Sequence, residues 1–376
     1  MNEGITVLSL FDGISCGQLA LDRLGVKVKS YYASEVDKYA MGETQRNYPD
    51  TVQIGDVTKI NTSSLPKIDI LIGGSPCQGF SFAGHEKGMV TQTNVKVLTL
   101  DHYLQLKEKG FEFDGQSYLF WEYIRILKAV KPKYFLLENV KMSSKWKVVL
   151  SRAIGCNPIF INSKLVSAQS RPRLYWTNIG QKPFGLFGDM KCEIPQPKDK
   201  RILLKHILQE EVHPKYFISG KKIGFLNGHS AKTGNKFKVF SGDEKCSCLT
   251  ASEGKHNLGG NYVQHGIVKY KRTEEARLVR KINLAKGKDY SPFKEKEIAG
   301  FDFDKSSTLT TSVSNDNLLC DTFTGKIRRL TPVEYERLQT LPDGYTDGAS
   351  DSQRYKMIGN GWNVDTVVHI LSFAKF

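Results

Sequence analysis

The chain has 376 residues, which is long enough for one large domain and a smaller module, since single hydrophobic cores stop growing near ~250–300 residues. Hydrophobic residues make up 40% of the chain and aromatic residues 11%, a globular composition that excludes an extensively disordered protein. The net charge of +15 favours a polyanionic partner such as nucleic acid, although a merely soluble basic surface would carry the same sign.

The sequence also limits the cellular setting. It shows neither the basic start and apolar core of a signal peptide nor a run of about 18 apolar residues, so we expect a soluble, cytoplasmic protein without a membrane partner. Seven cysteines, scattered except for Cys246 and Cys248, argue against a disulfide framework and leave free thiols. We see no metal-ligand set and no sign of an obligate protein partner. Residues 201–290 hold 18 Lys and Arg against 8 Asp and Glu, which makes them the candidate docking surface.

The first half of the chain alternates predicted strands and helices. Apolar runs predict strands over 5–11, 28–36, 68–74 and 133–140, and helical spacing of apolar residues predicts helices over 17–25, 39–48 and 117–131. Repeated strand, loop and helix units indicate an α/β fold, with a mostly parallel sheet and helices on both faces.

Ligands in such folds bind beyond the carboxyl ends of the strands, so the loops carrying Gly13, Glu35, Cys77 and Glu138 should converge on one crevice. The loop "FDGISCG" opens a helix with small residues, as a ligand-binding loop or a plain tight turn would. Glu35 stands where nucleotide sites bind ribose hydroxyls, and Asp56 could accept from an adenine amino group. The alternatives are a solvated surface carboxylate for Glu35 and a helix N-cap for Asp56.

Three further features could carry chemistry. Most lone cysteines are buried and inert, but the loop "GGSPCQGFS" around Cys77 is too poor in apolar residues for a packing site. Glu138 follows a buried apolar strand, so it is partly desolvated and could hold or share a proton, or it could cap the next helix. Arg171 and Arg173 lie two apart on an extended segment and therefore on one face. They could bind phosphate, favour a thiolate or form an ordinary surface pair.

From about Pro183 onward the composition of the sequence changes. Pro, Gly and Lys become frequent and the β-like runs are short, which predicts a less regular, β-rich domain. Helical pattern returns where Thr331 and Glu334 form a predicted capping box with Pro332 in the first turn. The apolar end of the chain predicts a helix that packs back on the first lobe. We therefore divide the chain into 1–182, 183–324 and a returning C-terminal segment, 325–376.

These motifs together resemble the DNA (cytosine-5) methyltransferase family along nearly the whole chain except its middle. In family order, "FDGISCG" resembles the cofactor loop, "SEVD" and "GDV" the acidic cofactor contacts, "GGSPCQGFS" the Pro-Cys loop and "ENV" the catalytic carboxylate. "QSRPR", "RRLTPVEYERLQTLPDGY" and "IGNGWNV" resemble the later motifs. Ser15 and Cys16 replace two glycines of the usual loop, which looks more like the animal de novo branch. We expect a segment from about Met89 to Leu106 to be extra, either a lid extension or a further DNA contact.

The resemblance implies a Rossmann-like, S-adenosylmethionine-dependent methyltransferase sheet and an irregular target-recognition domain over 183–324. It implies methyl transfer to C5 of a cytosine flipped out of double-stranded DNA, through a covalent adduct of Cys77, in a prokaryotic or phage setting such as restriction-modification. Glu138 would bond the cytosine ring, assisted by Arg171 and Arg173 of the arginine motif. The implied cofactor-binding residues are Phe11, Asp12, Gly13, Ile14, Glu35, Val36, Asp56, Val57, Pro76, Leu119, Asn360 and Val364. The alternatives are a transfer RNA cytosine-5 methyltransferase and a non-catalytic DNA-binding relative.

Overall fold

The structure, a computed structural model, describes residues 4–76, 79–80, 89–184, 189–219, 238–240, 243–249, 261–264, 267–272, 278–279, 281–282, 296–302 and 327–376. It divides into two compact units. The first contains Met1–Ile207, Lys245–Asn257 and Thr331–Phe376, and the second contains Leu208–Glu244 and Leu258–Leu330. The division at 183 and 324 stays a prediction.

A seven-stranded sheet forms the centre of the first unit, with the strand order β3-β2-β1-β4-β7-β9-β8. The strands are β1 (Ile5–Leu10), β2 (Val28–Ser34), β3 (Val52–Gln53), β4 (Ile70–Gly74), β7 (Tyr134–Val140), β8 (Ile159–Asn162) and β9 (Pro172–Thr177). All neighbouring pairs from β3 to β7 are parallel, whereas β9 pairs antiparallel with both β7 and β8. The expected α/β architecture with a mostly parallel sheet is therefore confirmed.

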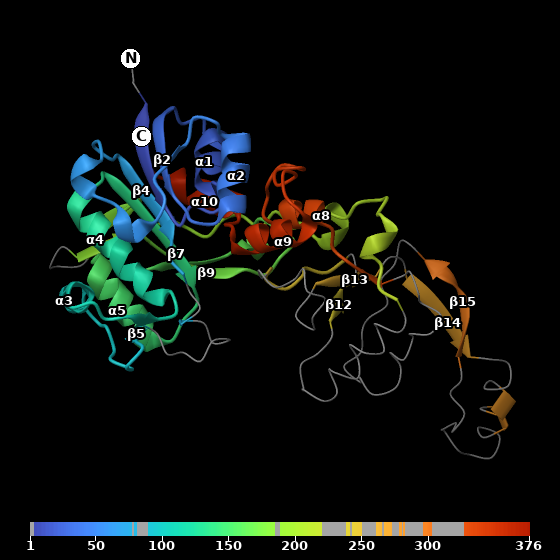
Figure 1. Ribbon diagram of the computed structural model, residues 1–376. Coiled ribbons are helices and arrows are strands. Elements are labelled where there is room, and N and C mark those ends of the chain that lie inside the picture. Colours follow the sequence, from blue (N-terminus) through green and yellow to red (C-terminus); the bar gives the residue numbers. More distant parts are fainter. Residues whose placement is uncertain are drawn as a thin grey trace. The chain divides into compact units, whose positions relative to one another are not determined.

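Helices cover both faces of this sheet because the strands are apolar on both sides. Leu8 and Leu71 belong to a core cluster with residues of α4 (Phe120–Val130) and α5 (Ser144–Ile154), including Phe120 and Trp146. On the other face, α1 (Cys16–Arg23) packs against α10 (Val364–Leu371), the predicted terminal helix. Figure 1 shows α1 and α10 on one side of the strands and α4 and α5 on the other. The C-terminal segment therefore completes the first unit.

Three helices complete the first unit around the ends of its strands. They are α2 (Lys38–Asn47), α8 (Pro332–Leu338) and α9 (Asp351–Asn360). The predicted capping box is confirmed: Thr331 Oγ1 accepts from Glu334 N at 3.2 Å, and Glu334 Oε2 accepts from Thr331 N at 2.7 Å. A hairpin of β10 (Gln181–Phe184) and β11 (Asp189–Cys192) follows β9.

The extra segment is folded into the same core. It contains β5 (Val90–Thr91) and most of α3 (Leu100–Glu108), and β5 pairs antiparallel with β6 (Phe113–Asp114), which follows the segment. Met89 and Val97 are fully buried in the cluster that also contains Phe120 and Trp146. Burying such side chains contributes about 1.5–3 kcal/mol each. The segment from Met89 onward is therefore an integral part of the domain.

In the second unit the structure describes short strands. β12 (Val239–Phe240), β13 (Tyr262–Gln264) and β16 (Ile327–Arg329) form one sheet, and β14 (Ile267–Arg272) pairs with β15 (Lys296–Asp302). Most of the predicted docking stretch, 201–290, lies outside the described residues. Within the part of the chain that the structure describes, no helix has the length and apolarity needed to cross a bilayer.

Candidate active site

Glu138 lies near the carboxyl end of β7, level with the end of β4. It stands beside Gly74 of β4 in the parallel register and opposite Tyr175 of β9 in the antiparallel one, and it is 9% exposed. A Cβ atom on residue 74 would lie 2.8 Å from Trp362 Nε1 and 3.3 Å from Glu138 Oε2. Only glycine therefore lets the indole and the carboxylate close on the end of β4. Trp362 did not figure among the predicted site residues.

Arg173 and Glu138 form an ion pair across β9 and β7. Arg173 Nε lies 2.7 Å from Glu138 Oε1, and both side chains are nearly buried. Burial lowers the pKa of Arg173, but the charge of Glu138 more than offsets this, so that the pKa is raised overall. A carboxylate and a guanidinium are thus held together at the ends of β7 and β9, largely out of solvent, which makes a surface pair of arginines the wrong alternative.

Arg171 is the second arginine of the motif and is 3% exposed. Its Nη2 donates to the carbonyl oxygens of Gly359 at 3.2 Å and Gly361 at 2.8 Å, and its Nη1 to that of Leu249 at 3.3 Å. Nη1 also lies 3.4 Å from the Cys248 Sγ atom. Arg171 therefore ties three distant segments together beside the Glu138–Arg173 pair.

The loop after β4 is anchored on both sides of the predicted nucleophile. Asn139 Nδ2 donates to the Ser75 carbonyl at 3.2 Å and to Ser75 Oγ at 3.0 Å, and Gly79 N donates to Ser117 Oγ at 2.8 Å. Pro76 is half-buried. Cys77 itself lies outside the described residues, so its role stays a prediction.

The loop after β1 has unusual backbone geometry. Phe11 and Ser15 have φ angles of 57° and 55°, in the left-handed region, and Gly13 between them has 59°. Ser15 Oγ and Tyr31 OH both donate to the Asp12 carboxylate, the latter at 2.8 Å. Burial raises the pKa of Asp12 from 3.8 to about 6. Ser15 adopts the glycine-like conformation that the family resemblance leads one to expect at its position.

Glu35 holds this loop against the end of β2. Its Oε2 accepts from Gly13 N at 2.9 Å, and its Oε1 accepts from Val36 N at 2.7 Å and Asp37 N at 2.9 Å. The surface-carboxylate alternative is therefore wrong, since three backbone donors engage Glu35. The Val36 side chain next to it is 72% exposed.

Asp56 caps a short 3₁₀ helix, Val57–Lys59, by accepting from Thr58 N at 2.9 Å and Thr58 Oγ1 at 2.8 Å. The structure thus shows the N-cap alternative. Both of these bonds use Oδ1, so the second carboxylate oxygen, Oδ2, takes no part in the cap. Among the other predicted cofactor residues, Ile14, Val57 and Val364 are buried, Leu119 is half-buried and Asn360 is exposed. Their contacts with a cofactor remain predictions.

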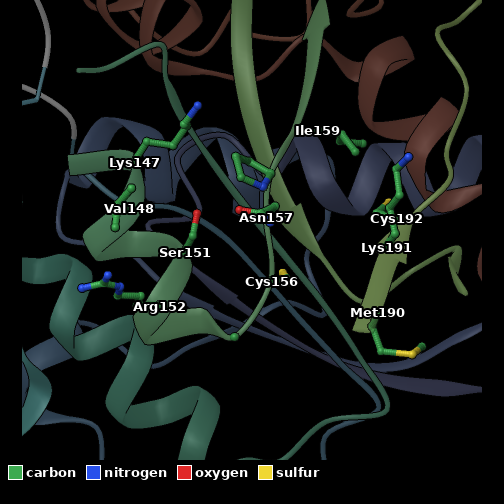
Figure 2. A pocket seen from close by; sticks show the side chains of 12 residues that line it. Lys147, Val148, Ser151, Arg152, Cys156, Asn157, Ile159, Met190, Lys191 and Cys192 are labelled. Carbon is green, nitrogen blue, oxygen red and sulfur yellow. The ribbon is translucent and has the colours of Figure 1, made fainter. Parts of the chain in front are cut away.

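A separate pocket of about 900 Å³ lies between α5 and β11 (Figure 2). It is lined by cations such as Lys147 and Arg152 and by two thiols, Cys156 and Cys192. Burial raises the pKa of Cys156 to about 11 and also raises the pKa of Cys192. None of the predicted site residues lines this pocket.

The family model described as "C-5 cytosine-specific DNA methylase" matches residues 5–374. The chain belongs to this family. The resemblance read from the motifs is confirmed, and the activity of this methylase is DNA cytosine-5 methylation. Membership favours DNA over transfer RNA as the substrate and an enzyme over a non-catalytic relative.

Curated relatives cover nearly the whole methylase. The type II methyltransferase M1.ScrFI of Lactococcus lactis subsp. cremoris is 28% identical over 96% of this chain and 75% of its own. M.HpaII of Haemophilus parainfluenzae is 27% identical over 98% and 88%, and the orphan methyltransferase M.SPRI of Bacillus phage SPR is 26% identical over 97% and 96%.

Solved structures agree on the fold. The methyltransferase EhMeth of Entamoeba histolytica superposes with a TM-score of 0.62 at 16% identity, over 98% of this chain and 97% of that one. A DNMT2 mutant of Spodoptera frugiperda gives 0.58 at 21% identity, over 98% and 99%. At these identities the likeness concerns the fold, which is the expected Rossmann-like methyltransferase fold.

Proposed function

We propose that the crevice at the ends of β1, β2, β4 and β7 binds S-adenosylmethionine and a cytosine flipped out of double-stranded DNA, with Cys77 as the nucleophile. The observation that carries this proposal is the 2.7 Å ion pair between Glu138 and Arg173, beside Gly74. Three residues after Gly74 the chain reaches Cys77, and both flanks of Cys77 are fixed by Ser75 and Gly79. The predicted nucleophile thus belongs to a loop that is anchored at Ser75, next to the strand that carries the oriented Glu138 carboxylate.

The described residues around the crevice fit an adenosine-like group. An added Cβ atom on Gly13 would meet nothing within 4 Å, so its α-carbon faces open space that a ligand can approach. Val36 offers an exposed apolar surface to a purine ring, and Asp56 keeps Oδ2 for an amino group because Thr58 uses only Oδ1. Glu35 fixes the backbone of Gly13 and Val36 between these features.

Chemically, the cofactor supplies an electrophilic methyl group. The Cys77 thiolate adds to C6 of cytosine, and the new S–C6 bond makes C5 nucleophilic. Glu138 bonds the N3 and amino edge of the ring, where basicity grows during the addition. Arg173 holds that carboxylate from the other side. After C5 has gained the methyl group, a base takes the C5 proton and the S–C6 bond breaks, which regenerates the thiolate.

Duplex DNA accounts for the charge of the methylase. Its net charge of +15 and the basic stretch over 201–290 suit phosphate contacts, while side chains of that stretch would read base edges. The names of M1.ScrFI and M.HpaII describe type II methyltransferases, which supports a restriction-modification role for this chain.

Transfer of labelled methyl from S-adenosylmethionine to duplex DNA tests the role of Cys77. Cys77→Ala should fold and bind DNA, but it should transfer no methyl above background, because the covalent addition is lost. Cys192→Ala, which changes a thiol in the pocket between α5 and β11, is the matched control and should keep full activity. Methyl incorporation by Cys77→Ala at the wild-type rate would refute the nucleophile assignment.

Two further measurements separate the alternatives. Incubation with duplex DNA containing 5-fluorocytosine should trap a covalent complex through Cys77, since the fluorine cannot leave as a proton does. Parallel assays with transfer RNA should give no incorporation. Methylation of transfer RNA alone, or the absence of any trapped complex on DNA, would favour the RNA enzyme or the non-catalytic relative.

A further inference from the structure

Among the described residues around the end of β7, buried positive charge exceeds carboxylate. Arg171 and Arg173 are both nearly buried, and Glu138 is the carboxylate that pairs with Arg173. A buried guanidinium needs hydrogen-bond acceptors and a counter-ion, because removing an unpaired charge from water is costly. One of the two arginines therefore needs a further negative group.

The bonds of Arg171 show where that need lies. Its partners among the described residues are the carbonyl oxygens of Leu249, Gly359 and Gly361 and the sulfur of Cys248. Carbonyl oxygens satisfy N–H donors but carry no net charge. Of these four described partners only the thiol can ionise, so Cys248 is the one among them that can supply the missing charge.

Cys248 is placed between the two guanidinium groups. Its Sγ atom lies 3.4 Å from Arg171 Nη1 and 3.6 Å from Arg173 Nη2. The backbone fixes this position, since Cys246 N donates to the Ala168 carbonyl at 2.9 Å and Ser170 N donates to the Cys246 carbonyl at 3.0 Å. These backbone hydrogen bonds between the two segments thus hold the thiol beside the arginines.

The electrostatic surroundings agree with this geometry. Burial raises the pKa of Cys248, but the charges and hydrogen bonds of Arg171 and Arg173 lower it by more. The pKa of Cys248 therefore lies below the ordinary value. The other titratable groups facing it are Tyr175, whose pKa is raised by burial and by Glu138, and Glu138 itself across Arg173. Tyr175 therefore stays neutral and does not compete for the arginines.

We propose that Cys248 is an ionised thiolate that serves as the counter-ion of Arg171 and Arg173 and thereby positions Arg173 against Glu138. Arg173 is held at three points, by Glu138 at Nε, by the Pro172 carbonyl at Nη1 and by the sulfur at Nη2, which fixes the plane of its guanidinium and the direction of the carboxylate. Cys248 is a positioning residue, a second functional thiol beside the predicted nucleophile.

The ionisation is tested by the ultraviolet absorbance of thiolates, recorded from pH 5.5 to 9.5 on the folded, full-length protein. The difference between wild type and Cys248→Ser isolates the contribution of Cys248 without any need for reagent access. We expect one thiolate to titrate with a midpoint below the ordinary value of about 8.5. Cys156→Ser is the control, and it should give almost no difference signal over this range, because burial raises the pKa of Cys156 to about 11. A midpoint for Cys248 at or above the ordinary value would overturn the proposal.

The positioning role is tested by comparing Cys248→Ser with Cys248→Asp. Serine keeps the size and a hydrogen-bond acceptor but removes the charge, so kcat should fall by roughly 10- to 100-fold, the scale of a lost charge-assisted hydrogen bond. Aspartate restores the charge and should recover most of kcat, whereas a merely structural cysteine would tolerate serine better. Equal kcat for wild type and Cys248→Ser, or lower activity of Cys248→Asp than of Cys248→Ser, would refute the role.

The two tests fail separately. The kinetic comparison rests on the proposed function of the crevice, whereas the titration does not. If Cys77→Ala retained methyl transfer while Cys248 still titrated below the ordinary value, the proposed nucleophile would be wrong and the counter-ion assignment would stand. If Cys248 titrated at the ordinary value while Cys77→Ala was inactive, the counter-ion assignment would be wrong and the proposed nucleophile would stand.

Discussion

At the scale of single residues, the loop after β1 keeps a carboxylic acid out of water. Asp12 receives hydrogen bonds from Ser15 Oγ and Tyr31 OH, and burial raises its pKa to about 6. Ser15 meanwhile occupies left-handed backbone space, which costs an L-residue roughly 1–2 kcal/mol. The hydrogen bond to Asp12 offsets part of this strain, so serine is acceptable where the resemblance leads one to expect glycine.

The raised pKa of Asp12 makes its stability contribution depend on pH. Because the pKa in the folded state, about 6, exceeds the ordinary value of 3.8, the contribution is full below pH 3.8 and is lost as the pH rises through 6. Between pH 5 and 7.5 this amounts to about 1 kcal/mol. Urea unfolding should therefore show that Asp12→Asn gains that much relative to wild type over this interval.

Asp50→Asn, which changes an exposed carboxylate, is the matched control for this titration. Its free energy of unfolding relative to wild type should change little over the same interval. An Asp12→Asn difference that does not vary with pH would contradict burial of the carboxyl as the cause.

At the scale of elements, the extra segment is joined to the sheet domain by one buried carboxylate. Glu122 of α4 accepts from Tyr103 OH at 2.6 Å and Lys107 Nζ at 2.5 Å, both on α3, and from Arg125 Nε at 2.7 Å. The Glu122 side chain is 0% exposed. The network fastens α3 to α4.

Glu122→Gln should destabilise the protein by about 2–4 kcal/mol, because a neutral amide cannot balance two cations and turns one acceptor into a donor. Chemical denaturation measures this loss. Glu108→Gln, at the exposed end of α3, is the matched control and should change stability by less than about 0.5 kcal/mol. Equal stability of the two variants would show that the network does not hold α3.

Sequence patterns predicted these elements to different degrees. The runs that became β1, β4 and β7 were found because strands buried on both faces are continuously apolar, and the capping box of α8 was found from Thr331 and Glu334. The antiparallel placement of β9 was not predicted, since strand direction depends on the connection through β8. The packing of α3 was equally hidden, because Glu122 reads as an ordinary helical glutamate until Tyr103 and Lys107 are brought to it.

The candidate site divides in the same way. Glu138 and Arg173 were predicted from motifs, and their ion pair is seen directly. Cys248 and Trp362 were not predicted, because each acquires its neighbours only through tertiary contact. The neighbours of Cys248, Arg171 and Arg173, lie more than 70 positions away from it in the sequence. The close spacing of Cys246 and Cys248 was the one signal in the sequence. It did not indicate a role for either thiol, because the proximity of Cys248 to Arg171 is visible only in the fold.

At the scale of the whole molecule, the charge governs how the methylase meets DNA. A net charge of +15 on 376 residues predicts affinity dominated by phosphate contacts and release of counter-ions. If six to ten phosphates are contacted, affinity should fall by roughly 10³–10⁵-fold between 50 and 200 mM salt. Fluorescence anisotropy with one labelled duplex at several salt concentrations measures the slope.

The Lys and Arg residues of the stretch 201–290 should carry much of that slope. Reversing several charges within it should flatten the salt dependence, while the same number of reversals on the exposed side of α2 and α3 should not. A salt-independent affinity would indicate that base contacts or shape, and not phosphate charge, dominate binding.

The bonds of Arg171 also have a consequence for the order of events during synthesis. Its acceptors Gly359 and Gly361 follow it by 188 and 190 positions, close to the end of the chain. While the ribosome is still translating the intervening residues, the guanidinium lacks these acceptors and must stay hydrated. Arg171 can therefore be buried as the structure shows only after residue 361 has been made. The Arg171 contacts form late in synthesis, long after the strands of the sheet have left the ribosome.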